Sequence, residues 1–476
     1  MTHHHMDDKI VVGLDIGSTK VCAVAGRLSR NGNQPMLEVL GVSRANSEGV
    51  TKGKVMNISR TVDAINRAIE EVSNQSNVDI GLVNVSFSNH NINSQKQPGS
   101  ITRLSPGDEV TSADIDHLLR DMYRTPQLAG KEIVHVLPMD FTVDSETGVE
   151  DPVGRNGVKL GADFQIITTQ ADAAVNVRRC IERTASHLQR DQMLLSPLAS
   201  AMAVLTPEER EAGVALVDIG GGTTDLAIYY RNVLRHVAVF PWAGNCLTND
   251  IQEGCKVLPQ QAEVLKIKFG NANPNTYRLN EVVSVPGLPG RQPKDVLLRN
   301  VSIILGERLK EIAALVQAEV IRSGYKDKLL GGIVLTGGTA MIDGIDEVFR
   351  TVTEMDVRVG YPEQLEYNLR ADLVSDPAYA TAVGLVWAGF RSVDDRISFI
   401  SDPGLVSTPQ SVNGNGQSRP AEGPRPGPGP MPKSNAGQAA VKPAEPTDSG
   451  TSGGWLSWIK KMINPKLGDV NDSYRD

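Results

Sequence analysis

The clearest pattern along the chain is a pair of apolar runs separated by a short polar turn. One copy begins at Val214 and reads VALVDIGGGTTDLAIYY, in which an apolar run ends at Asp218 and a glycine-rich turn precedes a second apolar run. Short apolar runs bounded by glycine are typical of two buried strands joined by a tight turn. On this pattern alone, an ordinary β-hairpin is a sufficient interpretation.

A second copy of the pattern lies near the N-terminus. It begins at Val11 and reads VVGLDIGSTKVCAVAG, with the same order of apolar run, Asp-Ile-Gly, small hydroxyl residues and second apolar run. The two copies are too far apart for a solenoid protein, in which the repeat unit is about 20–50 residues long. The repetition therefore predicts two similar half-molecules, each of which presents one such turn to a common cleft.

The residue types at these turns predict phosphate binding. A plain hairpin explains one or two glycines, but it does not explain the flanking acids and hydroxyls, whereas successive glycines let backbone N–H groups point at an anion. Asp15 and Asp218 end their strands beside the turns, where a carboxylate can hold Mg²⁺ through water. The candidate residues are Asp15, Gly17, Ser18, Thr19, Lys20, Gly220, Gly221, Gly222, Thr223 and Thr224.

Lys20 follows its turn directly and would add positive charge where phosphate charge collects, although a solvated loop lysine is the alternative. A third glycine turn, in VLTGGTAMIDGI, follows a predicted strand over residues 333–335 and precedes a helix expected to open at Met341. Such a turn suits a nucleotide base or α-phosphate. Glu263 and Lys266 share a face if their segment is helical, and they could hold ribose and adenine or form an ordinary surface pair. The candidates for the adenosine side are thus Glu263, Lys266, Gly337, Gly338 and Met341.

Further elements follow from the same periodicities. The pattern predicts helices over residues 60–72, 115–123 and 296–323, and a strand over 132–144. Thr111 and Asp114 have the spacing of a capping box for the helix at 115–123.

Composition narrows the classes of function. The chain has 476 residues, enough for two or more domains, and its net charge of −8 argues against general nucleic-acid binding. Cys22, Cys180, Cys246 and Cys255 lack metal-like or redox-like spacing, so we interpret them as free thiols in a reducing cytosol. Three histidines at 3–5 are interpreted as a tag remnant. No signal peptide or stretch long enough to span a bilayer is visible in the sequence.

The C-terminal region changes character after about residue 402. Proline, glycine and serine dominate residues 402–452, which predicts a disordered linker. Apolar residues return in WLSWIKKMI, and an amphipathic helix over 453–467 would lie on an anionic membrane surface, with docking on the globular body as the alternative. The expected membrane contacts are Trp455, Leu456, Trp458, Ile459, Lys460, Lys461, Met462 and Ile463.

The motifs DIGSTK, DIGGGTTD and LTGGTA resemble the phosphate and adenosine motifs of the actin, hexokinase and heat-shock chaperone ATPase superfamily. Together with SEGVTKGKV, EDPVGRNGVKL, DPAYATAVGL and GGWLSWIKKMI, they make the chain closely similar to the FtsA family of bacterial cell-division proteins, outside the proline-rich segment. Arg155 departs from the family, which often has methionine there. The resemblance implies an α/β fold of duplicated, actin-like ribonuclease-H-type domains around a nucleotide cleft, with an inserted small α+β subdomain and a disordered tail ending in an amphipathic helix.

The same resemblance implies a function. It implies an ATP- and Mg²⁺-binding cytoskeletal protein that polymerises on the cytoplasmic face of the bacterial inner membrane at the division site. There it would tether FtsZ filaments and recruit other division proteins, without binding nucleic acid. Arg308, on an exposed-looking helix face with Arg299 and Lys310, is the expected contact for the acidic C-terminal tail of FtsZ. Ser196 stands where chaperone relatives have a water-orienting glutamate, so we expect at most a slow ATPase.

The resemblance also implies domain limits. They are core half 1 at 1–84 and 162–206, the insert at 85–161, core half 2 at 207–242 and 329–401, its outer subdomain at 243–328, and the tail described above. In the resembled family the insert serves filament contacts and division partners. Three rival functions are a sugar kinase or phosphatase of the same superfamily, a chaperone-like ATPase, and a nucleotide-free adaptor.

Overall fold

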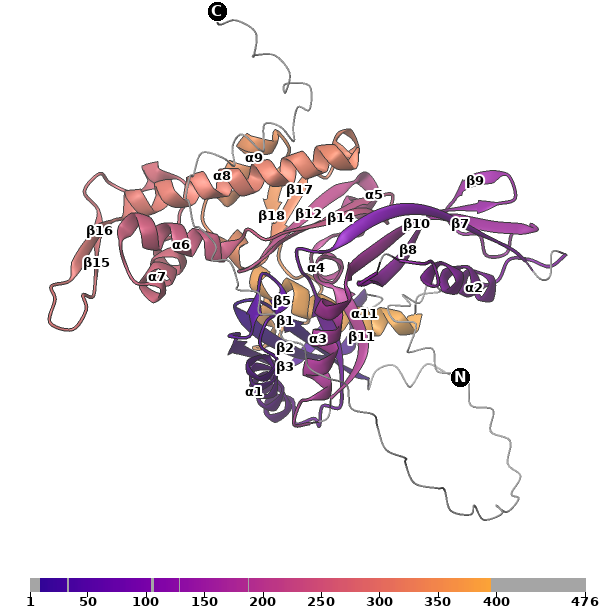
Figure 1. Cartoon of the computed structure of the whole chain (residues 1–476), viewed down its shortest axis with the longest axis horizontal. Coiled ribbons are helices and arrows are strands. Elements are labelled where there is room, and N and C mark those ends of the chain that lie inside the picture. The colour runs from indigo at the N-terminus through magenta and orange to yellow at the C-terminus, as the bar shows by residue number, and fades with distance from the viewer. Residues whose placement is uncertain (1–8, 32–33, 104–106, 128, 187, 395–476) are drawn as a thin grey trace, which may run out of the picture. The chain divides into compact units, whose positions relative to one another are not determined.

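Two five-stranded sheets with the same topology form the core of the protein (Figure 1). The computed structural model describes residues 9–31, 34–103, 107–127, 129–186 and 188–394. The histidines at 3–5, the linker at 402–452 and the expected membrane contacts at 455–463 lie outside these residues.

The first sheet has the strand order β11-β6-β1-β2-β3. Strands β1, β2 and β3 are antiparallel neighbours, whereas β6 runs parallel to β1 and β11 parallel to β6. The strands are β1 (Ile10–Ile16), β2 (Lys20–Asn31), β3 (Gln34–Asn46), β6 (Leu82–Phe87) and β11 (Gln189–Leu195).

The second sheet repeats this arrangement in the order β14-β13-β12-β17-β18. Its first three strands are again antiparallel neighbours, and β17 and β18 continue in parallel beside β12. The predicted duplication is therefore confirmed. The strands are β12 (Val214–Ile219), β13 (Thr224–Tyr230), β14 (Val233–Phe240), β17 (Ile333–Thr336) and β18 (Val357–Val359).

Two apolar helices, α4 (Ser196–Val204) and α11 (Ala380–Asp394), pack between the sheets and share one hydrophobic core with both. Alternation along β12 places Val214 and Leu216 in this core, whereas Val217 faces the other side of the sheet. Around the first sheet lie α1 (Ile58–Ser76), α3 (Ala171–Glu182), α10 (Ala371–Val374) and the short hairpin of β4 (Val50–Thr51) and β5 (Lys54–Val55).

The long helix α8 (Leu298–Ser323) and α9 (Ile345–Thr353) cover the other face of the second sheet (Figure 1). The remaining elements of this half are α5 (Pro207–Ala212), α6 (Gly244–Cys255), α7 (Pro259–Phe269), β15 (Val282–Val285) and β16 (Lys294–Leu297). Single 3₁₀ turns occupy η1 (Pro274–Thr276), η2 (Lys326–Lys328), η3 (Gly338–Met341) and η4 (Pro377–Tyr379).

The inserted subdomain has its own sheet, in the order β7-β10-β8-β9, and its own hydrophobic core. The predicted capping box is present, because the Thr111 backbone N–H donates to Asp114 Oδ2 at 2.9 Å. The insert contains β7 (Asn93–Thr102), α2 (Ser112–Tyr123), β8 (Lys131–Val143), β9 (Glu146–Val149) and β10 (Lys159–Gln170). The predicted boundary after residue 161 falls inside β10, because all of that strand stays paired within this sheet.

Most sequence-predicted helices and strands are confirmed, and the helix expected to open at Met341 is wrong. Met341 does not open a helix, because it ends the 3₁₀ turn η3, and α9 starts only after Gly344 at a φ of 76°. All four cysteines are unpaired. Within the described part of the chain, no helix combines the length and the apolar character that crossing a bilayer demands.

Candidate functional site

Each core half presents the same tight turn. In the first half the Gly17 N–H donates to the Lys20 carbonyl at 2.9 Å, and in the second the Gly220 N–H donates to the Thr223 carbonyl, also at 2.9 Å. The two acids occupy equivalent places before these turns, with Asp15 near the end of β1 and Asp218 near the end of β12. The repeated sequence motif thus folds into a repeated piece of structure.

The glycines of the second turn are required because the first turn packs against them. A Cβ added at Gly221 would lie 2.3 Å from Thr19 Cγ2, and one added at Gly222 would lie 2.3 Å from Ser18 Oγ. Both distances are far below van der Waals contact. A hairpin alone would not need glycine at both positions, so contact between the halves explains Gly221 and Gly222.

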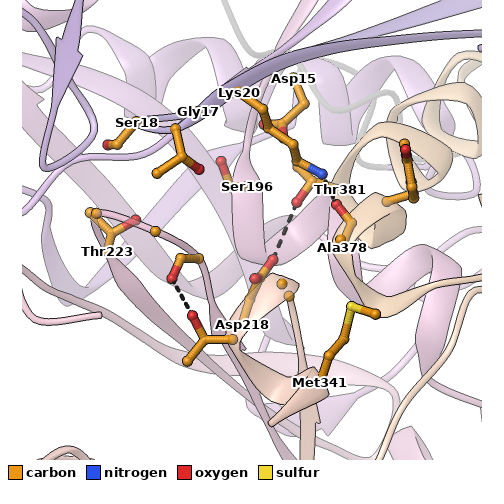
Figure 2. A pocket seen from close by; sticks show the side chains of 18 of the residues that line it. Asp15, Gly17, Ser18, Lys20, Ser196, Asp218, Thr223, Met341, Ala378 and Thr381 are labelled. Carbon is orange, nitrogen blue, oxygen red and sulfur yellow. Dashed lines mark hydrogen bonds between the residues drawn. The ribbon is translucent and has the colours of Figure 1, made fainter. Parts of the chain in front are cut away.

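A cavity of about 370 Å³ opens beside the paired turns (Figure 2). This volume is in the range typical of small-molecule sites, which is about 300–1,000 Å³. The sequence-predicted residues that line it are Asp15, Gly17, Ser18, Thr19, Lys20, Asp218, Gly220, Gly221, Gly222, Thr223, Glu263, Lys266, Gly337, Gly338 and Met341.

Thr224 is the predicted phosphate-side residue that does not line the cavity. It is fully buried, pairs with Ile219 in the strand ladder, and its hydroxyl donates to the Trp242 carbonyl at 2.7 Å. Because side chains alternate along a strand, Thr223 and Thr224 face opposite ways. The predicted role of Thr224 as a phosphate donor is therefore wrong.

Three carboxyl groups with hydroxyl partners line the cavity. Asp15 Oδ1 accepts from Ser86 at 2.7 Å, and Asp218 Oδ2 accepts from Ser200 at 2.6 Å and from Thr381 at 3.2 Å. Asp225, which sequence reasoning did not assign, accepts from Ser88 at 2.9 Å.

Burial is the main cause of the raised pKa of each of these carboxyl groups. The neighbouring Asp218 raises the pKa of Asp225 further, to well above its usual range, and the nearby Lys20 ammonium opposes the shift at Asp15. Oxygen donors of this kind suit a hard divalent cation. Among the described residues, no group of three or more acids, histidines or cysteines has the geometry to hold a metal ion by itself.

On the other side of the cavity, Glu263 and Lys266 form an ion pair on α7, with 2.8 Å between Glu263 Oε2 and Lys266 Nζ. Lys266 Nζ also donates to Thr248 Oγ1 at 2.8 Å and to the Gly244 carbonyl at 3.1 Å. The third glycine turn is fastened to the second hairpin, since Thr339 Oγ1 donates to the Gly220 carbonyl at 2.8 Å. The predicted adenosine-side residues therefore lie against the phosphate-side turns.

The segment 376–381 is a part of the wall that sequence reasoning used only as a family marker. Lys20 Nζ donates to the Ala378 carbonyl, and Thr381 Oγ1 donates to Asp218 Oδ2 (Figure 2). The Gly337 N–H donates to the Pro377 carbonyl at 3.2 Å. The first two of these contacts join residues 358 and 163 positions apart in the chain. No local pattern could reveal them, although the motif DPAYATAVGL marked the segment.

The two remaining predicted residues are Ser196 and Arg308. Ser196 lines the cavity at the start of α4. Arg308 is not the exposed cation that we expected, because it is half-buried between Asp250, at 2.6 Å, and Glu311. The hydrogen bonds that Arg308 donates to Asp250 are the main reason that the Arg308 pKa lies above its usual range.

Comparisons with known proteins agree with this architecture. A family model described as "Cell division protein FtsA" matches residues 215–384, and one described as "SHS2 domain inserted in FTSA" matches 89–168. The latter span corresponds to the inserted subdomain. A solved structure titled "PilM-PilN type IV pilus biogenesis complex" is similar in fold, with a TM-score of 0.54 and 15% identity over 80% of this chain and 98% of that one.

Curated relatives are considerably more similar in sequence. The cell division protein FtsA of Pseudomonas aeruginosa is 37% identical over 392 residues, which cover 82% of this chain and 91% of the relative. The FtsA of Escherichia coli (strain K12) is 34% identical over 393 residues, covering 81% and 91%. The resemblance inferred from the motifs is confirmed, and the chain belongs to the FtsA family of cell division proteins.

Proposed function

We propose that the cavity binds ATP with a magnesium ion, and that the nucleotide holds the two core halves together. The observation that carries this proposal is the pair of equivalent turns, Gly17–Lys20 and Gly220–Thr223, packed against each other at one cavity. A phosphate chain in the cavity beside them would meet backbone N–H groups and hydroxyls from both halves at once. Its binding energy would therefore oppose opening of the cleft.

The charges at the site support a metal-bound triphosphate. Asp15, Asp218 and Asp225 line the cavity beside the turns, and the Lys20 ammonium acts to lower the pKa of Asp15 and of Asp218. A bare triphosphate would be repelled by these acids, whereas a divalent cation shared through water with Asp15 and Asp218 would compensate both. The adenosine would lie toward Glu263 and Lys266, beside the third glycine turn.

We propose that hydrolysis is slow. Ser196 lies at the cavity wall in the place where chaperone relatives have glutamate, and a serine hydroxyl is a poor general base at neutral pH. A positioned base is commonly worth about 10²–10⁴-fold in rate. The nucleotide would then be mainly a structural ligand that favours polymers.

At the level of the cell, we propose that the protein forms filaments on the inner membrane at the division site, tethers FtsZ and recruits other division proteins. Membership of the family supports this role. The anchor would be the helix proposed at 453–467, and avidity along a filament would strengthen its weak single contact. An FtsZ tail contact at Arg308 would have to compete with Asp250 and Glu311 for the guanidinium.

Titration of the full-length protein with ATP, with and without magnesium, tests the nucleotide proposal. At a concentration of about 100 times Kd, ATP should stabilise the fold by about 2.7 kcal/mol in a thermal unfolding assay. The variant Gly338→Val should lose this stabilisation, because its side chain would occupy cavity space; the added Cβ itself meets only Ala378, at 3.7 Å. Gly81→Val is the matched control, since nothing lies within 4 Å of a Cβ there.

An unchanged unfolding midpoint at millimolar magnesium-ATP would overturn the nucleotide proposal. Electron microscopy on an anionic lipid monolayer, with and without ATP, tests the filament proposal separately. We expect ordered arrays only with ATP, and arrays that ignore the nucleotide would contradict a structural role for it.

A further inference from the structure

The surroundings of Lys20 suggest a role for a residue outside the repeated motifs. Lys20 is the first residue of β2, and its ammonium points at the Ala378 carbonyl (Figure 2). The same ammonium lies over the ring of Tyr379, with 4.6 Å between Nζ and the ring centroid. Both partners belong to the segment between the third glycine turn and α11.

Both partners of Lys20 are neutral, although acids are near. The Lys20 charge opposes the raised pKa of Asp15 and of Asp218, so the ammonium lies in their electrostatic neighbourhood. Among the described residues Lys266 forms an ion pair with Glu263, whereas Lys20 forms none. A carbonyl and an aromatic face attract a cation without neutralising it. The Lys20 charge therefore stays available to an anionic ligand.

Tyr379 is itself held in place. It is half-buried at the cavity wall, and the Arg44 side chain donates a hydrogen bond to its hydroxyl. The preceding Pro377 carbonyl accepts from the Gly337 N–H at 3.2 Å, which ties the segment to the third glycine turn. Burial raises the pKa of the Tyr379 hydroxyl, so the ring is neutral at physiological pH. The ring face is thus a fixed surface rather than a mobile one.

We propose that Tyr379 is a positioning residue for the phosphate end of the site. Its ring and the Ala378 carbonyl hold the Lys20 ammonium at the cavity wall, away from an ion pair with Asp15 or Asp218. The inference rests on the proposed binding of a nucleotide, and it adds that the phosphate contact of one half depends on an aromatic ring that precedes α11.

The test compares ligands with and without phosphate. Calorimetric titrations of the full-length protein would measure Kd for magnesium-ATP, magnesium-ADP and adenosine. For Tyr379→Leu we expect Kd for ATP to rise about tenfold, with adenosine affinity unchanged, because only phosphates contact Lys20. For Tyr379→Phe we expect a smaller rise, since the ring remains and only the hydrogen bond from Arg44 is lost.

A double-variant cycle separates positioning from general damage. Lys20→Met removes the charge at similar length, and adding Tyr379→Leu to it should cause no further loss of ATP affinity, because the ring would then have no cation to hold. Phenylalanine at 379 with increasing ring fluorination preserves shape while weakening the negative ring face, so Kd for ATP should rise stepwise. This series remains informative if Tyr379→Leu fails to fold.

Three results would overturn the inference. They are an equal loss of ATP and adenosine affinity in Tyr379→Leu, additive losses in the double variant, or no response to fluorination. If the unaltered protein binds no magnesium-ATP, the proposed function fails instead, so the two failures are distinguishable.

Discussion

Replacing Gly222 by alanine tests the explanation of the glycine run most directly. The added Cβ would lie 2.3 Å from Ser18 Oγ and 2.5 Å from Ser18 Cβ, across the boundary between the core halves. Ser18 cannot simply rotate away, because its hydroxyl accepts from the Gly53 N–H at 2.9 Å. The substitution must therefore separate the two turns or break that hydrogen bond.

The magnitude follows from these two routes. Ordinary contact needs about 3.5 Å between heavy atoms, so the turns would have to move apart by roughly 1 Å. Overpacking of this kind costs about 1–3 kcal/mol, and loss of the Ser18 hydrogen bond costs about 0.5–1.5 kcal/mol. Breaking the hydrogen bond alone would leave Ser18 Cβ 2.5 Å from the new carbon, so overpacking should set the loss of folding free energy at about 1–3 kcal/mol. ATP affinity should fall as well, since both turns would shift.

Urea unfolding and ATP titration would measure the two effects. Gly81→Ala is the control, because nothing lies within 4 Å of a Cβ at Gly81, and there we expect no loss of stability. Ser18→Gly removes the two atoms closest to the new Cβ and leaves only the Lys52 nitrogen at 3.2 Å, so the double variant Ser18→Gly, Gly222→Ala should recover most of the added loss. A Gly222→Ala protein as stable as the unaltered chain, or a double variant with additive losses, would refute contact between the turns as the cause of the glycine run.

Three other perturbations address buried charged and titratable groups, of which only Asp225 lines the cavity. Asp140→Asn should lower the free energy of unfolding by about 1–2 kcal/mol, because it leaves the buried Arg235 guanidinium, 2.5 Å from Asp140, without its counter-charge. The loss is moderate because Asp140 is itself partly solvated. The exposed pair of Arg155 and Glu146 is the control, and Glu146→Gln should cost less than about 0.5 kcal/mol. Asp225→Asn should stabilise the protein at pH 7. Because the folded-state pKa of Asp225 is raised, Asp225 stabilises the fold below the unfolded pKa of 3.8, and this contribution is lost as pH rises above that value, whereas asparagine does not titrate. A difference in thermal midpoint between the variant and the unaltered protein that is as large at pH 3.5 as at pH 7 would contradict this. His135 Nε2 accepts from the Leu195 N–H at 3.0 Å, and burial lowers its pKa from 6.5 to about 4, so folding stability should fall as pH decreases between these values, and the fall should be shallower in His135→Gln.

Local pattern was enough to predict the repeated turns, the capping box of α2 and the cavity's glycine loops. Each of these depends on residues that are close in sequence, such as Thr111 and Asp114 or Gly220 and Thr223. Strand register was harder, because a shift of one residue reverses the side chain's direction, and this is why Thr224 was wrongly assigned.

Contacts between distant segments could not be predicted from the sequence. Asp225 is paired by Ser88, 137 positions away, and Asp218 by Thr381, 163 positions away. Arg308 was expected to be exposed because its helix face looks polar, yet Asp250 on another helix covers it. The helical period shows which residues share a face, but it does not show which neighbouring acid that face meets.

The two turns are equivalent in backbone but not in chemistry. Lys20 in one half corresponds to Thr223 in the other, and the fully buried, inert Cys22 corresponds to Asp225. A site with exact twofold symmetry would bind an elongated ligand equally well in either of two opposite orientations. Here the Lys20 ammonium belongs to one half and the Asp225 carboxyl to the other, so the two sides of the pocket differ in charge. An elongated charged ligand complements both groups in only one orientation.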